Sequence, residues 1–199
     1  MEMRRCQKGF TLAELLIVVA IIAVLVAISI PIFNSQLEKS RRAVDLQTAR
    51  TIESVLANSV NDGTIQFPSN MQNNKNYSVY VMISRDNKST PSSYKNLYKT
   101  GTLFCGADPS VVINNKKSQA WDTYQDELAI LLTNSGINLD SLKVTCKSFN
   151  NDGWDWIIVN VGYTKGKLVT RIYSGKANTN GDASLNLGNT NIEKLINRQ

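Results

Sequence analysis

The sequence contains no histidine among its 199 residues. Without an imidazole group, Ser-His-Asp and Cys-His catalytic centres and a His-Glu-x-x-His zinc site are all excluded. The Gly-x-x-x-x-Gly-Lys-Ser/Thr loop that holds nucleotide phosphates is also absent. We therefore expect a protein that is not an enzyme and that uses no cofactor, although composition alone leaves carboxylate chemistry open.

Charged residues make up only 19% of the chain and hydrophobic residues 42%, which is typical of a folded rather than a disordered protein. The net charge of +6 is compatible with nucleic acid or an anionic surface. Such a modest excess is more often a solubility charge, so we do not expect nucleic-acid binding. The run Asn178–Asp182 resembles a calcium loop but carries a single acid, and we interpret it as an exposed loop without metal.

Charge is absent from Leu15 to Phe33, and Ser29 is the one polar residue in that run. A helix of about 20 apolar residues is long enough to cross a bilayer. Basic residues precede it, so the amino terminus should remain in the cytoplasm. Glu14 begins the run, and a carboxylate in lipid costs roughly 2.5–3.5 kcal/mol on insertion scales. It is either an acid near the membrane interface or a carboxylate retained for a partner.

The stretch Gly9-Phe10-Thr11-Leu12-Ala13-Glu14-Leu15-Leu16 follows a short basic leader. It resembles the cleavage and methylation motif of type IV prepilins and related pseudopilins, most of all the Gram-positive clostridial-type major pilins. The position of Pro31, 21 residues beyond Phe10, also resembles the pattern of this family. The resemblance covers about the first 50 residues. It implies cleavage between Gly9 and Phe10, N-methylation of Phe10, and roles for Glu14 and Pro31 in filament assembly.

This resemblance implies a structural subunit, a major pilin, that polymerises into an extracellular type IV pilus for adhesion, surface motility or biofilm formation. The implied partners are further copies in a helical filament, the membrane, a prepilin peptidase, and an assembly platform with its ATPase. A host or abiotic surface is a further candidate partner. The chain would lie in the cytoplasmic membrane before assembly and at the cell surface afterwards. Two alternatives stay open: a pseudopilin of a competence or secretion system that moves DNA or protein, and a minor pilin or binding module that does not polymerise.

The expected organisation is a cleaved leader (residues 1–9), a long helix (10–61) and a globular head (62–199). Residues 10–33 of the helix would form the transmembrane segment and filament core. The helix should turn amphipathic beyond it, with an apolar face of Leu37, Val44, Ile52 and Leu56. Pro31 lacks an N–H group and is expected to cause a mild kink. Asn61-Asp62-Gly63 is typical of a helix end.

The head is predicted to be α+β, with the long helix packed against an antiparallel sheet of about four strands. Strands are expected at Tyr77–Ile83, Leu142–Lys147, Trp154–Tyr163 and Lys167–Tyr173. Leu103–Cys105 and Val111–Ile113 are predicted to form a hairpin. A second helix should run over Ser118–Asn134 with Trp121 and Tyr124 on its apolar face and Gly136 as its C-cap, and a last short helix over Ile192–Ile196. Polar loops at 70–76, 87–93 and 175–191 remain for surface contacts.

Cysteine is scarce, with Cys6, Cys105 and Cys146 the only three. Cys6 would depart with the leader, and an even number of cysteines outside the cell favours a bridge. Cys105 and Cys146 each alternate in step with apolar neighbours. We therefore predict a disulfide between them, with two separate buried thiols as the alternative. Because 53 residues follow Cys146, the receptor-binding loop closed near the C-terminus of many Gram-negative pilins is not carried over.

Overall fold

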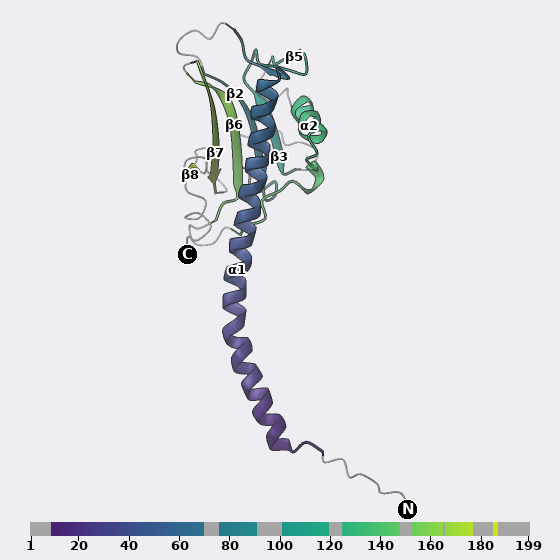
Figure 1. The fold of residues 1–199 in the computed structure, drawn as a ribbon, viewed down its shortest axis with the longest axis vertical. Helices are drawn as coiled ribbons and strands as arrows, with labels where there is room; N and C mark the ends of the chain where they lie inside the picture. The colour runs from purple at the N-terminus through teal and green to yellow at the C-terminus, as the bar shows by residue number, and fades with distance from the viewer. Residues whose placement is uncertain are drawn as a thin grey trace, which may run out of the picture. The chain divides into compact units, whose positions relative to one another are not determined.

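A computed structural model describes residues 9–69, 76–90, 101–119, 125–147, 153–164, 166–176 and 185–186. The chain divides into two compact units, Met1–Glu38 and Lys39–Gln199. One helix, α1 (Leu12–Asn61), contributes to both units (Figure 1). We call the second unit the head unit. It includes the part of α1 from Lys39 to Asn61, whereas the predicted head begins at residue 62.

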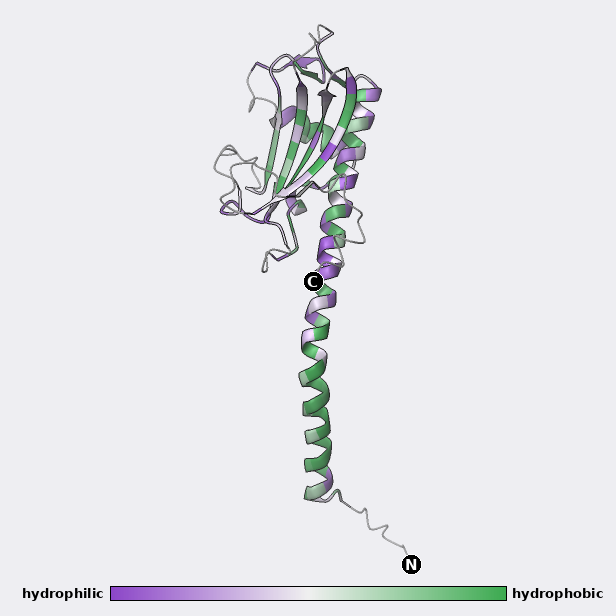
Figure 2. Cartoon of the chain, turned by 90° about the vertical axis from the view of Figure 1, so that its left-hand side faces the viewer, coloured by the Kyte–Doolittle hydropathy of each residue, from purple (hydrophilic) through white to green (hydrophobic). Residues whose placement is uncertain are grey.

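The first unit consists of Gly9, Phe10, Thr11 and the N-terminal part of α1. All its described residues up to Leu37 are exposed, and Figure 2 colours this part of α1 as hydrophobic. The helix continues through Pro31 without a break. Among the described residues, α1 is the one helix that is long and apolar enough to cross a membrane, by length and composition.

In the head unit, α1 is amphipathic, as predicted, but its buried face differs from the predicted one. Leu46, Ala49, Ile52 and Leu56 are buried at intervals of three to four residues. Val44, which the prediction placed on this face, is 52% exposed. Leu37, placed there too, is exposed in the first unit.

The end of α1 at Asn61 confirms the predicted stop. Gly63 adopts φ +81°, a left-handed conformation that glycine reaches without the strain of a side chain. The Asp62 carboxylate accepts a hydrogen bond from the backbone N–H of Thr64 at 2.9 Å, which fixes the turn that follows.

Five strands of the described residues form the main antiparallel sheet, in the order β3-β2-β6-β7-β8. Its strands are β2 (Tyr77–Ser84), β3 (Leu103–Ala107), β6 (Trp156–Thr164), β7 (Lys167–Gly175) and β8 (Leu185–Asn186). The α+β class and three of the predicted strands are thereby confirmed. β2 and β6, far apart in sequence, lie side by side at the centre.

A smaller sheet, in the order β1-β4-β5, is formed by β1 (Ile65–Gln66), β4 (Val112–Ile113) and β5 (Lys116–Lys117). The β4–β5 turn uses Asn114 and Asn115 at φ 50° and 62°, the left-handed pair that tight hairpins favour and asparagine tolerates. The predicted hairpin between Leu103–Cys105 and Val111–Ile113 is wrong, because β3 pairs with β2 whereas β4 pairs with β1 and β5.

The second helix, α2, runs over Gln125–Asn134 and is followed by a 3-10 helix, η1 (Leu139–Ser141). Its predicted start at Ser118 is wrong, because the Ser118 N–H donates to the Val111 carbonyl at 2.8 Å, outside any helix. Gly136 follows α2 at φ +85°, as predicted for a C-cap. Several predicted features lie outside the described residues: Trp121 and Tyr124, the last short helix and most of the loop at 175–191.

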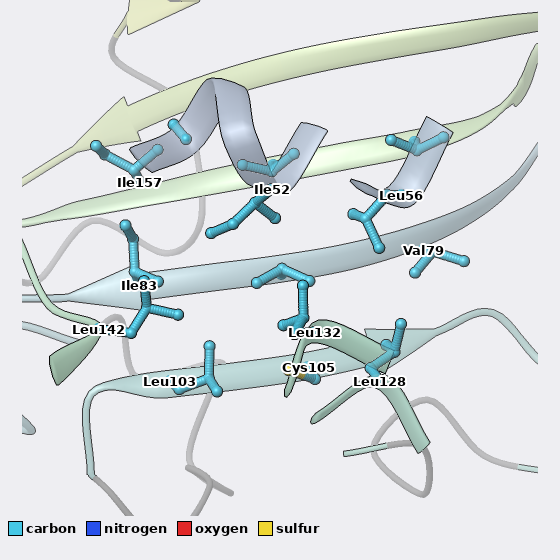
Figure 3. Packing of buried hydrophobic residues seen from close by; sticks show 14 of the residues in the cluster. Ile52, Leu56, Val79, Ile83, Leu103, Cys105, Leu128, Leu132, Leu142 and Ile157 are labelled. Carbon is cyan, nitrogen blue, oxygen red and sulfur yellow. The ribbon is translucent and has the colours of Figure 1, made fainter. Parts of the chain in front are cut away.

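The main core lies between the two helices and one face of the sheet. Figure 3 shows Ile52 and Leu56 of α1, Val79 of β2 and Leu128 and Leu132 of α2 pointing into it. A second buried cluster of the described residues uses the alternate positions of the strands. Its members are Met82, Phe104, Trp156 and Ile158. Both faces of β6 are therefore buried, as expected for a central strand.

The second cluster requires glycine at one position of β7. A Cβ added to Gly175 would lie 1.9 Å from Cζ2 of Trp156, its partner across the β6–β7 pair. Trp156 is fully buried, and its indole N–H donates to the Lys176 carbonyl at 2.9 Å. The indole cannot swing away without losing that bond, so its place in the sheet depends on Gly175.

The segment 142–147 alternates buried and exposed side chains as predicted, but it is not a strand. It crosses the end of the main sheet. The Thr102 hydroxyl donates to the Leu142 carbonyl at 2.9 Å, and the Val144 N–H donates to the Ser84 carbonyl at 3.2 Å. Alternation of apolar and polar residues indicates an extended chain with one buried face. Such a chain need not pair with a neighbouring strand. The predicted strand is therefore corrected to an extended crossing segment.

Asp45 of α1 supplies the hydrogen-bond partners that a neighbouring strand would have supplied. Its carboxylate, 1% exposed, accepts from the Thr145 N–H at 2.8 Å and the Thr145 hydroxyl at 2.6 Å. It also accepts from the Cys146 N–H at 2.9 Å and the Trp154 indole N–H at 3.2 Å. Four donors thus share one buried carboxylate, which ties α1 to the crossing segment.

Arg85 satisfies one carbonyl group of the crossing segment and one just before β6. Its guanidinium donates to the Cys146 carbonyl at 2.7 Å and to the Trp154 carbonyl at 2.8 Å. It also pairs with the Asp155 carboxylate at 2.6 Å. The planar guanidinium can serve several acceptors at once, so Asp45 and Arg85 together satisfy backbone groups that would otherwise be buried without partners.

The structure contradicts the predicted disulfide. Cys105 and Cys146 are both buried, and no bridge joins them. Cys105 lies opposite Val81, which lies opposite Val159 in β6. The Cys146 thiol donates to the carbonyl of Trp154 at 3.4 Å, five residues before Val159. Five residues of extended chain span roughly 16 Å, whereas a bridge needs Cα atoms within about 7 Å.

We expect Asp45→Asn to lower the free energy of unfolding of the head by about 3 kcal/mol. Whichever oxygen becomes an NH₂ group, at least one buried backbone N–H loses its acceptor, because Oδ1 accepts from the Thr145 N–H and Oδ2 from the Cys146 N–H. Urea unfolding of the full chain in detergent micelles, followed by tryptophan fluorescence, measures the change.

The matched control is Asp126→Asn, since Asp126 is exposed in the first turn of α2. It should change the free energy of unfolding by no more than about 0.5 kcal/mol. Equal stability of the two variants would show that the Asp45 bonds contribute nothing net.

Candidate functional site

The residues singled out by the sequence motif gather at the beginning of the first unit. Gly9 and Phe10 precede α1 and are exposed and non-helical, and α1 begins at Leu12. A Cβ added at Gly9 would meet no atom within 4 Å. The chain's own packing therefore does not require glycine at position 9, and any such requirement belongs to a partner that handles this bond.

Glu14 closes a capping box with Thr11. The Thr11 N–H and hydroxyl donate to Oε2 of Glu14 at 2.9 and 2.8 Å. In return the Glu14 N–H donates to the Thr11 hydroxyl at 3.3 Å. The pattern Thr-x-x-Glu before an apolar run is typical of a helix start, so the sequence carried a signal for Thr11 that the prepilin-type motif alone does not reveal.

The capping box decides how the carboxylate is held in the isolated subunit. A negative charge in the first turn is stabilised by the helix dipole and by the backbone N–H groups there. Glu14 is nevertheless exposed. The carboxylate is thus satisfied by its own chain and still accessible to a group from outside.

Large apolar side chains are exposed along the N-terminal part of α1, and Figure 2 colours this part as hydrophobic. A contiguous apolar surface of this extent is not stable in water and indicates lipid or protein contact. A helix that is apolar all round is typical of a membrane span or a buried core. The exposed apolar residues beyond Glu14 are Leu15, Leu16, Ile17, Val18, Val19, Ile21, Ile22, Val24, Leu25, Val26, Ile28, Ile30, Ile32 and Phe33.

Pro31 lies within this apolar surface. Because proline has no N–H, the carbonyl of Ala27 receives no helical hydrogen bond from position 31. Nearby, the Ser29 hydroxyl donates to the Leu25 carbonyl at 2.7 Å, which hides the one polar side chain of the run. The helix here is apolar on its surface and lacks one internal bond.

Elsewhere the described titratable groups serve the fold. Lys116 of β5 pairs with Glu127 of α2, and this hydrogen bond lowers the pKa of the Glu127 carboxyl. Burial raises the pKa of the Cys105 thiol, which makes it a poor nucleophile. Among the described residues, no group of three or more His, Cys, Asp or Glu side chains could hold a metal ion.

Three features define a class of protein before any comparison: an exposed non-helical segment at Gly9 and Phe10, a capped carboxylate at Glu14, and a helix with an exposed apolar surface. The family model described as the prokaryotic N-terminal methylation motif matches residues 4–30. That range contains Gly9, Phe10, Thr11 and Glu14, and ends one residue before Pro31.

Curated relatives extend the similarity into the head. A fimbrial protein of Dichelobacter nodosus is 30% identical over 158 residues, covering 77% of this chain and 91% of that protein. A type IV major fimbrial protein FimA of the same organism is 41% identical over 66 residues, which are 33% of this chain and 41% of that protein. No solved structure matches the chain significantly.

The chain therefore belongs to the type IV pilins, and it is a structural pilin subunit. The predicted family and fold class are confirmed. The relatives named here come from Dichelobacter nodosus, so the finer resemblance to clostridial-type major pilins stays a prediction.

We expect Thr11→Val to loosen the first turn of α1. Valine keeps the branched shape of threonine but lacks the hydroxyl, which donates to the Glu14 carboxylate and accepts from the Glu14 N–H. Loss of a capping side chain costs about 1 kcal/mol. Amide hydrogen exchange of the full chain in micelles should accelerate at residues 12–16. Thr11→Ser retains the hydroxyl and should exchange like the unmodified chain; identical exchange in all three proteins would contradict the capping role.

Proposed function

We propose that this pilin is held in the cytoplasmic membrane by the apolar part of α1 and then polymerises into an extracellular filament. One observation carries the proposal: the N-terminal part of α1 exposes apolar side chains from Leu15 to Phe33 and bears one carboxylate, Glu14, in its first turn. Lipid satisfies that surface before assembly, and the same surface of other copies satisfies it afterwards. The head unit, with its own buried core, would form the outside of the filament.

The absence of catalysis is part of the proposal. It is supported by the lack of histidine in the whole sequence and by relatives whose names are those of fimbrial proteins. The chemistry at the Gly9–Phe10 bond would come from a prepilin peptidase that cuts this bond and methylates the new amine of Phe10. Movement of subunits would come from an assembly platform and its ATPase.

Processing should depend on Gly9 for a reason that lies outside this chain. Because a side chain at position 9 has open space around it, Gly9→Val should leave the subunit folded and inserted but uncut. Mass spectrometry of membrane protein from producing cells should find the full-length precursor. Gly9→Ala, the smallest change, should be cut at least in part, and fibres whose subunits still begin at Met1 would contradict the proposed cleavage.

Assembly should depend on Glu14 through its charge. In the filament we propose that Glu14 pairs with the Phe10 amine of a neighbouring copy, since a cut chain offers one such cation per subunit. Removing one partner of a buried pair typically costs about 3–5 kcal/mol, so an incoming subunit would be favoured only in the correct register. The exposed carboxylate and its bond to Thr11 are compatible with an exchange of partners on docking.

Two substitutions separate the charge of Glu14 from its capping role. We expect Glu14→Ala to abolish or shorten fibres. Glu14→Gln keeps a side chain that can close a capping box but carries no charge, and it should also lose fibres while membrane insertion and cleavage persist. Electron microscopy of sheared fibres measures both, and normal fibres from the Gln variant would show that capping suffices without an ion pair.

Pro31 is proposed as the point where α1 loosens when subunits pack, because a helical bond is already missing there. β-branched residues near it, Val24, Val26, Ile28 and Ile30, favour extended backbone more than other apolar residues do. The role is a proposal for the assembled state, since α1 is unbroken in the subunit.

Two other functions compete with the major-pilin role: a pseudopilin of a competence or secretion system, and a minor pilin that does not polymerise. The retained Glu14 favours a polymerising subunit, and the size of the head unit favours a surface pilus. Adhesion, motility and biofilm formation are proposals of the same kind, with the polar loops as the candidate contacts. Antibody labelling of surface fibres distinguishes these alternatives. A major subunit is labelled along the whole fibre, a tip subunit only at its end, and a chain that is not part of the fibres is not labelled.

A further inference from the structure

We propose that Arg171 of one subunit pairs with Asp126 of a second copy, so that neighbouring heads bind each other in the filament. The inference rests on the proposed function and adds a specific contact between heads to it. It uses two surfaces that both belong to the head unit: the part of β7 around Arg171 and the exposed face of α2.

Arg171 carries a positive charge that the described part of the head does not neutralise. Among the arginines that the structure describes, it alone makes no hydrogen bond or ion pair, and its side chain is exposed. Its described neighbours on this face of the sheet are neutral: Asn160 lies opposite in β6, and Val169 and Tyr173 lie two residues away in β7. A planar guanidinium can bind a carboxylate through two parallel hydrogen bonds, so Arg171 suits an acid that comes from another chain.

The carboxylates without a partner lie in a different part of the head unit. Among its described acids, only Asp126 in the first turn of α2 and Asp140 of η1 make no hydrogen bond or ion pair through the side chain, and both are exposed. The other described acids of the unit are each engaged: Asp45, Glu53, Asp62, Asp86, Asp108, Glu127 and Asp155. The head therefore presents an unneutralised base on β7 and unneutralised acids around α2.

Ile130 gives the surface around Asp126 an apolar part. It is 48% exposed, and with Val44 of α1 it is one of the two large apolar side chains that are exposed among the described residues of the head unit. Four residues after Asp126, it lies on the same face of α2, with about 6 Å between the Cβ atoms. On β7, the half-buried Val169 lies about 7 Å from Arg171 on the same face. An acid beside an apolar residue thus meets a base beside an apolar residue at a similar spacing.

The two surfaces cannot meet within one chain. The strand order β3-β2-β6-β7 puts three strand spacings, about 14 Å, between β3 and β7. α2 packs beside β3, and Figure 1 shows α2 and β7 on opposite sides of the head unit. Each head can therefore bind one neighbour through β7 and another through α2. Such a contact between two different surfaces either closes into a ring or continues as an open helical filament.

Charge reversal in producing cells tests the pair. Arg171→Asp would bring two acids together, and like charges at an interface oppose docking, so we expect the mass of sheared fibres to fall by roughly tenfold or more. Arg171→Asp with Asp126→Arg restores opposite charges and should recover most of the fibre mass. The matched control, Arg171→Asp with Asp140→Arg, has the same net charge and should not recover it.

Cysteine cross-linking tests the same contact without depending on the charge variants. In Arg171→Cys with Asp126→Cys, a bismaleimide reagent too short to join β7 to α2 within one chain should link neighbouring subunits of a fibre. Cys105 and Cys146 are buried, so the new cysteines react first. Denaturing gels should then show a ladder of multimers, whereas Arg171→Cys with Asp140→Cys should give monomers.

The possible results separate this contact from the proposed function. The contact is overturned, with the proposed function intact, if Arg171→Asp leaves the fibre mass unchanged, if the exchanged pair does not recover it, or if the paired cysteines give no multimers. Recovery with Asp140→Arg would overturn Asp126 as the partner. An unmodified chain that forms no fibres would overturn the proposed function itself, and the contact with it.

Discussion

The buried carboxylate of Asp45 is the contact on which the head depends most. It joins α1 to residues 145 and 146, about 100 positions later, and to the indole of Trp154. Buried backbone N–H groups must find an acceptor, and the crossing segment has no strand beside it to provide one. Asp45 provides this acceptor from α1, so the crossing segment stays packed at the end of the sheet. The same bonds hold α1 in the core by a polar contact as well as by apolar packing.

Two carboxylates on the same helix are held in opposite ways, and the difference matches their functions. Asp45 is buried and shared among donors from distant parts of the chain. Within the part of the chain that the structure describes, Glu14 is exposed and accepts hydrogen bonds from Thr11, in its own first turn. A carboxylate satisfied by tertiary contacts cannot change partners without unfolding the head, whereas one satisfied by a local cap can. The second arrangement suits a subunit that moves from lipid into a filament.

The site was largely readable from the sequence because its elements are local. Gly9, Phe10 and Glu14 are recognised by their spacing, and the uncharged run that follows needs no tertiary partner to be identified. Thr11 and Glu14 form a Thr-x-x-Glu capping signal that overlaps the prepilin-type motif, and the motif by itself assigns Thr11 no role. The contact between the crossing segment and α1 could not be predicted from the sequence, since Thr145 meets Arg41 and Asp45 only in the folded chain.

The sequence by itself determined the long helix and its end at Asn61, the C-cap at Gly136, and the strands around Val79, Val159 and Ile172, because each depends on periodicity or on a glycine within a few residues. Only the tertiary structure decided that β3 and β4 join different sheets, that residues 142–147 cross the sheet instead of extending it, and that Cys105 and Cys146 stay apart. Those outcomes depend on which distant backbone or side chain supplies each hydrogen bond. A period of two states that one face is buried, but it does not state what covers that face or what lies beside the chain.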